Sequence, residues 1–154
     1  ARAQLLHAAQ AFGHADRGAI VAHDLDMRLA RLHVSALRGA LPVMYLSAGG
    51  ATPGPGVMMD VVIRAAGARN IATAPGWSVL PLERLTQTPP ALVALAFFDT
   101  GRTQVNAWSP SRHPAFAAAL ARARTVNLPA ASISCETWYN IDAAEIIAAA
   151  LHSP

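Results

Sequence analysis

Aromatic side chains are the residues of this sequence best suited to hold a ligand. The chain has three tryptophans, Trp77, Trp108 and Trp138, and Tyr139 follows the last of them directly. All four fall between the segments that we expect to form helices and strands. Indole and phenol rings offer a large contact area at a low cost in side-chain entropy. We therefore expect them to line a binding site for a bulky molecule, with Gly50 at its rim.

A glycine-rich segment, residues 49–56, is the second candidate site. A phosphate-binding P-loop requires Gly-Lys-Ser or Gly-Lys-Thr at the start of a helix, and this chain has no lysine. The dinucleotide fingerprint requires a third glycine after Gly54 and Gly56, at the position that Met59 occupies. Backbone amides in such a turn can still contact an anion. A small α/β enzyme or regulatory domain that binds a nucleotide or another anion there is therefore the alternative function.

Metal binding and catalysis find little support among the polar residues. His23 and His33 are ten positions apart, which places them on different faces of one helix, and the acidic residues are dispersed. No Gly-x-Ser-x-Gly nucleophile elbow is present. The single cysteine, Cys135, excludes an internal disulfide. The sequence therefore predicts a protein that is not an enzyme and has no resident cofactor or metal.

The composition predicts one globular domain. The 154 residues are 53% apolar and 14% charged, which suffices to bury a core. The net charge of +3 comes from scattered arginines, which argues against a nucleic-acid partner. The longest apolar run, residues 91–98, is too short to cross a bilayer, so we expect no membrane insertion. Residues 1–10 lack the apolar run of a signal peptide, so we expect an exported form to have lost its leader.

The first forty residues show a helical periodicity. A first helix is expected to stop at Gly13. A second places four apolar residues on one face, which we expect to pack against the rest of the domain. These residues are Val21, Leu25, Leu29 and Leu32.

From residue 41 the pattern changes to strands that alternate with helices. The expected strands are Pro42–Ser47, Asn70–Thr73, Ala91–Phe98 and Thr125–Pro129. Strands separated by helices form parallel pairs. The fold class is therefore α/β, a three-layer sandwich around a mainly parallel four-stranded sheet, preceded by an amphipathic helix. Asp142 with Glu145 predicts a capping box at the start of the last helix.

Ligands of such sheets bind outside the carboxyl ends of the strands. The segments at those ends are residues 47–56, 74–79, 98–108 and 130–140, and they contain all three tryptophans and Tyr139. We therefore expect the three indoles to surround one exposed concave face.

An ordered series of segments from about Arg17 onward resembles the second half of the class III, helical-backbone periplasmic binding proteins. The amphipathic helix is similar to the end of the helix that links the two lobes of that family. The segments with matching order and spacing are Arg64–Ile71, Trp77–Leu85, Gln87–Phe97, Arg112–Pro114 and Cys135–Ala143. One departure stands out: the family has two lobes, and this chain has room for one lobe and the linker helix.

The resemblance implies a domain organisation and a function. Residues 1–40 would include the interlobe linker helix, and residues 41–154 would form the C-terminal α/β lobe. The chain would be the solute-binding lobe of an ABC importer receptor for an iron complex, haem or a corrinoid such as cobalamin. It would be exported to the periplasm, and its partners would be a bulky ligand, held together with the other lobe, and an ABC permease. In this family an acidic residue of each lobe docks onto the permease, and Asp99 and Glu136 are the candidates.

Overall fold

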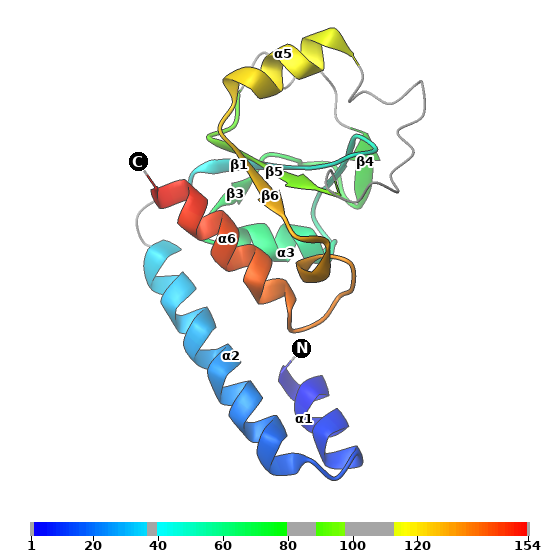
Figure 1. Cartoon of the computed structure of the whole chain (residues 1–154), viewed down its shortest axis with the longest axis vertical. Coiled ribbons are helices and arrows are strands. Elements are labelled where there is room, and N and C mark those ends of the chain that lie inside the picture. The colour runs from blue at the N-terminus through cyan, green and yellow to red at the C-terminus, as the bar shows by residue number, and fades with distance from the viewer. Residues whose placement is uncertain (1, 37–39, 80–88, 98–112, 154) are drawn as a thin grey trace.

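A helical hairpin stands beside an α/β layer in the computed structural model, which describes residues 2–36, 40–79, 89–97 and 113–153 (Figure 1). Helix α1 (Arg2–Ala11) and helix α2 (Ala15–Ala36) form the hairpin. The turn between them has Gly13 at a φ of 72°, where a side chain would be strained. Gly18 is buried against α1, and a Cβ there would lie 2.3 Å from that of Ala9. The hairpin thus depends on close helix contact at a glycine.

Helix α2 packs against the α/β layer through one side. Its buried residues include Ala22, Leu25 and Leu32, and it contacts α3 (Met58–Ala65) and α6 (Asn140–His152). The predicted face is therefore partly wrong, because Leu29 is 42% exposed and Val21 is only half-buried. The contact face is centred on Leu25, and Leu29 lies at its edge.

The main sheet contains the four strands expected from the sequence, all parallel. They are β1 (Pro42–Ser47), β3 (Arg69–Asn70), β5 (Leu92–Ala96) and β6 (Thr125–Leu128). Their spatial order is β3-β1-β5-β6, with Val43 opposite both Asn70 and Leu92. The two central strands are apolar and covered on both sides, as parallel strands require.

Helices cover both faces of this sheet, which confirms the three-layer sandwich. Successive strand residues point to opposite faces, so Val43 and Tyr45 join the core under α3 and α6, whereas Met44 and Leu46 pack with Phe116 of α5 (Pro114–Arg122). Figure 1 shows α5 on one side and α3 and α6 on the other. None of the helices in the described part of the chain is both long and apolar enough to cross a membrane.

A second, two-stranded sheet was not predicted. Strand β2 (Ala51–Pro53) pairs antiparallel with β4 (Trp77–Val79). Both segments were expected to be loops. Each has three residues and the partners are far apart in sequence, so no local pattern reveals the pairing.

The expected capping box is wrong. Helix α6 begins at Asn140, after a 3-10 turn at Ala130–Ser132, and its start has no side-chain cap hydrogen bond. Asp142 and Glu145 bind Arg28 of α2 instead.

Candidate ligand-binding site

A cavity of about 180 Å³ opens at the edge of the molecule where the parallel strands end. Its walls come from three segments: the start of α3, strand β4, and the loop before α6. The lining residues include Met58, Trp77, Cys135, Glu136 and Asn140. The cavity therefore lies at the edge that the strand-end argument selected.

Trp77 forms the aromatic wall of this cavity. Its place is set by the β2–β4 ribbon, in which it pairs with Pro53. One edge of the indole packs against the ring of Tyr45, at a centroid distance of 5.8 Å and an interplanar angle of 66°. Trp77 is 53% exposed. Burial raises the pKa of Tyr45 to about 12, so this phenol is neutral beneath the indole.

The glycine-rich segment shapes the ribbon that carries Trp77. Gly50 is buried in the turn after β1 with a φ of 85°, and its amide donates to the carbonyl of Ser47 at 2.8 Å. The amide of Ala51 donates to Ser47 Oγ at 3.0 Å, and that of Gly54 to the carbonyl of Gly76 at 2.8 Å. Three amides that an anion would need are thus engaged within the protein. Contact of Gly50 with a ligand stays a prediction.

Trp138 and Tyr139 form a stacked pair, with ring centroids 3.7 Å apart and planes at 27°. Tyr139 is 50% exposed, whereas Trp138 is half-buried and packs against the core. Trp138 lines a second, apolar cavity of about 290 Å³ between α2, α3 and α6. Met58 and Asn140 line both cavities.

The predicted site residues are therefore only partly brought together. Trp77 and Glu136 line one cavity, and Trp138 lines the neighbouring one. Trp108 and Asp99 lie outside the described residues. The expectation that three indoles surround one face stays a prediction for Trp108.

Two lining residues, Met58 and Asn140, were not singled out from the sequence. Met58 is an apolar residue of an amphipathic helix and carries no distinguishing signal. Asn140 follows the aromatic pair at the start of α6, where asparagine often bonds to nearby backbone groups. That preference was the one available signal for it.

The backbone at this edge is also unusual beyond β5. Phe97, directly after the strand, has a φ of 62°, which is uncommon for a residue with a side chain. Such conformations persist where surrounding structure enforces them, and they cluster at functional sites. Among the described residues, no three His, Cys, Asp or Glu side chains gather into a group that could hold a metal ion.

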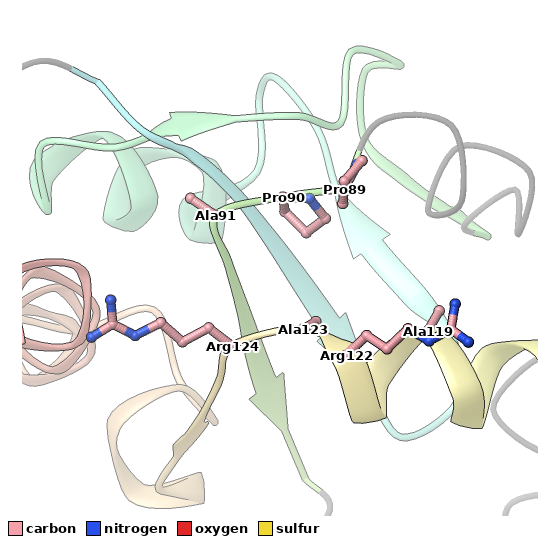
Figure 2. A pocket seen from close by; sticks show the side chains of 7 residues that line it. All are labelled: Pro89, Pro90, Ala91, Ala119, Arg122, Ala123 and Arg124. Carbon is pink, nitrogen blue, oxygen red and sulfur yellow. The ribbon is translucent and has the colours of Figure 1, made fainter. Parts of the chain in front are cut away.

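A larger cavity of about 520 Å³ lies where β5 and β6 begin, lined by residues 89–91 and 122–124 and by Ala119 (Figure 2). Its arginines, Arg122 and Arg124, point in opposite directions in Figure 2. Arg124 donates to the carbonyl of Ser153 at 2.6 Å. The two guanidinium groups therefore do not form a joint anion clamp.

Comparison with known proteins identifies the fold through structure. No protein-family model matches the sequence, and no curated protein matches it. The periplasmic heme-binding protein BhuT, solved with two hemes, has a TM-score of 0.68 and 23% identity over 97% of this chain and 62% of its own. The periplasmic heme-binding protein RhuT from Roseiflexus sp. RS-1 has a TM-score of 0.68 and 20% identity over 98% and 63%. The ABC-type Fe3+-hydroxamate transport system from Saccharomonospora viridis DSM 43017 has a TM-score of 0.71 and 18% identity over 99% and 55%.

The chain thus spans between 55% and 63% of these three proteins. It has the fold of one lobe of a periplasmic binding protein. The resemblance that the sequence suggested is confirmed at the level of the fold. The solved structures compared here are named for solute binding or transport, and none of the three is named as an enzyme.

Proposed function

We propose that this chain is the solute-binding lobe of an ABC importer receptor and has no enzymatic activity. The observation that carries the proposal is the cavity beside half-exposed Trp77, at the carboxyl edge of the sheet, in a fold shared with solved heme-binding proteins. In this proposal residues 41–154 are the C-terminal lobe, and residues 1–40 include the linker helix. The protein works in the periplasm.

We propose haem or a ferric siderophore as the ligand, with a corrinoid as the third possibility. Two of the compared structures are named for heme and one for an Fe3+-hydroxamate. An open indole face on a fixed strand suits a large ligand with apolar surface. The pair of Trp138 and Tyr139, of which Tyr139 is 50% exposed, would extend that contact beyond the cavity.

A second lobe would complete the site. Helix α1 has no buried residue, and Phe12 and Ile20 of the hairpin are 78% and 70% exposed. A second lobe packed against the hairpin would remove these apolar side chains from water. We propose that the other lobe of the receptor covers them and closes over the ligand.

Permease docking is assigned to acidic residues at the rim. Glu136 is exposed beside the cavity and is available to an arginine of the permease. Asp99, which follows β5 in the sequence, is the first candidate, and Glu136 is the second. Replacing each by its amide in a two-lobed receptor should weaken complex formation with the permease. Unchanged complex formation in both variants would remove this assignment.

Protection of Cys135 from alkylation tests ligand binding at the cavity. Cys135 is the single cysteine of the chain, it is exposed, and it lines the same cavity as Trp77. In a two-lobed receptor, rising concentrations of haemin, or of a ferric hydroxamate, should slow the reaction of Cys135 with iodoacetamide. The substitution Trp77→Leu should weaken the protection, whereas Leu41→Ala should not, since Leu41 precedes β1 at the far edge of the sheet. Equal alkylation rates with and without both ligands would overturn the proposed function.

A further inference from the structure

We propose that Asn140 is the positioning residue of the ligand-binding site, holding the loop of residues 132–139 in the shape that ligand contact requires. This loop, here called the rim loop, carries Cys135 and Glu136 at the cavity and the stacked pair of Trp138 and Tyr139. The effect on binding rests on the proposed function. The effect on the loop itself does not.

The side chain of Asn140 bridges both ends of the rim loop. Its Nδ2 donates to the carbonyl of Ser132 at 2.8 Å, and its Oδ1 accepts from the amide of Thr137 at 2.8 Å. The residue is 5% exposed, and its own amide donates to the carbonyl of Thr137 at 3.2 Å. One side chain must therefore donate and accept at the same time, which an amide does and a carboxylate does not.

Other hydrogen bonds of the rim loop are local. Ser132 Oγ donates to the carbonyl of Pro129, and the amide of Thr137 also donates to the carbonyl of Cys135. These bonds join residues two or three positions apart. The bond from Asn140 to Ser132 spans eight positions, so it closes the loop as a whole.

The hydrogen bonds of Asn140 attach the rim loop to a helix that is buried in the core. Ile141, Ala144 and Ile147 of α6 are at most 6% exposed and belong to the main core cluster. Because α6 is fixed in the core, the hydrogen bonds of Asn140 fix the rim loop relative to α6. It also lines both cavities, so its side chain forms part of the wall that the proposed ligand would meet.

Hydrogen exchange of the rim loop tests this role without a ligand. In Asn140→Asp an oxygen replaces the donor that faces the carbonyl of Ser132. Amides of residues 133–139 should then exchange about tenfold faster, equivalent to about 1.4 kcal/mol of local stability. Those of β5 and β6 should exchange as in the unchanged chain. Asn127→Asp adds the same charge at an exposed position of β6 and should leave the rim loop unaffected.

A second control separates positioning from general stability. Ile147→Val removes a methylene from the core of the same helix and should lower global stability without a selective effect on the rim loop. Equal exchange in Asn140→Asp and the unchanged chain would overturn the inference. Faster exchange of the strands together with the loop would also overturn it, because Asn140 would then act only through global stability.

Haemin protection of Cys135, measured in a two-lobed receptor, supplies the functional readout. In Asn140→Asp, and in the uncharged Asn140→Ser, the haemin concentration for half protection should rise several-fold. The two controls, Asn127→Asp and Ile147→Val, should keep the original value. If haemin fails to protect the unchanged two-lobed receptor while exchange of the rim loop still accelerates in Asn140→Asp, the proposed function fails and the positioning of the loop stands. Protection unchanged in both Asn140 variants would overturn the positioning role in binding.

Discussion

At the scale of single residues, the open face of Trp77 depends on a close approach between two backbone segments. Gly54 lies where a Cβ would be 1.7 Å from the carbonyl oxygen of Ala74. Because this contact is with backbone, no side-chain rotation relieves it. The amide of Gly54 donates to Gly76 across the same contact, one residue before Trp77. The ribbon can therefore hold the indole only with glycine at position 54.

We predict that Gly54→Ala lowers the free energy of unfolding by about 2 kcal/mol or more, because the ribbon must separate to admit the methyl group. Urea unfolding followed by tryptophan emission measures the change. Gly49→Ala is the matched control, since its Cβ would lie 3.8 Å from Ser47 Oγ, an ordinary contact. The control should stay within about 0.5 kcal/mol of the unchanged chain. Equal stability of the two variants would contradict the steric argument.

The sequence predicts where the site lies better than it predicts which side chains form it. The strand-end rule places Trp77 and Glu136 at one edge, where they line one cavity. It does not reveal that Trp138 turns toward the linker helix, because that depends on packing against α2 and α3. Nor does it identify Asn140, whose partners follow from how the rim loop folds back.

At the scale of elements, the first two turns of α6 join helix α2 to the α/β layer. Arg28 of α2 donates two hydrogen bonds to Glu145, at 2.9 and 2.6 Å, and another to Asp142. The side chain of Arg28 is only 16% exposed. Since Asn140 stands at the start of the same helix, α6 holds both helix α2 and the rim loop.

We predict that Arg28→Gln lowers the free energy of unfolding by about 1–2 kcal/mol at neutral pH. The reason is that it removes charge-assisted hydrogen bonds at a partly exposed site. The hydrogen bond from Arg28 holds the pKa of Glu145 below its ordinary value of 4.5. Because the pKa is lowered in the folded state, the ionised carboxylate stabilises the protein at pH values above the ordinary pKa. This contribution is lost as the pH falls through the pKa of the folded state. The difference between the two proteins should therefore shrink below about pH 4.5.

Thermal unfolding across this pH range checks the prediction. Arg17→Gln is the control, since it removes an exposed arginine from the same helix. It should leave the midpoint nearly unchanged at every pH. A constant difference for Arg28→Gln down to low pH would show that Glu145 does not provide the pairing.

The long-range contacts also explain which elements the sequence predicts. The strands of the main sheet follow from continuous apolar runs, and β1, β5 and β6 are found within two residues of the expected bounds. Asp142 and Glu145 have the spacing of a capping box, yet they bind an arginine over one hundred residues away. The β2–β4 ribbon likewise depends on a partner distant in sequence. Neither of these long-range contacts can be predicted from a local sequence pattern.

At the scale of the whole molecule, the lobe presents its candidate site on one side only. The hairpin of α1 and α2 projects beyond the sheet layers (Figure 1), and it exposes Phe12 and Ile20. The chain spans 55–63% of the three binding proteins compared above. These features agree with a lobe that shares its ligand with a second one.

We predict that this chain alone binds no small solute tightly. A receptor that encloses its ligand from two sides gains affinity from burying most of the ligand surface, and one lobe covers about half of it. At about 25 cal/mol per Å² of apolar area, the loss of roughly 150 Å² of contact removes about 4 kcal/mol, close to a thousandfold in affinity. A receptor with micromolar affinity would fall toward millimolar. Titration with haemin, a corrinoid and several ferric siderophores measures this directly. Submicromolar binding of any of them would show that the single lobe is a complete receptor and that no second lobe is needed.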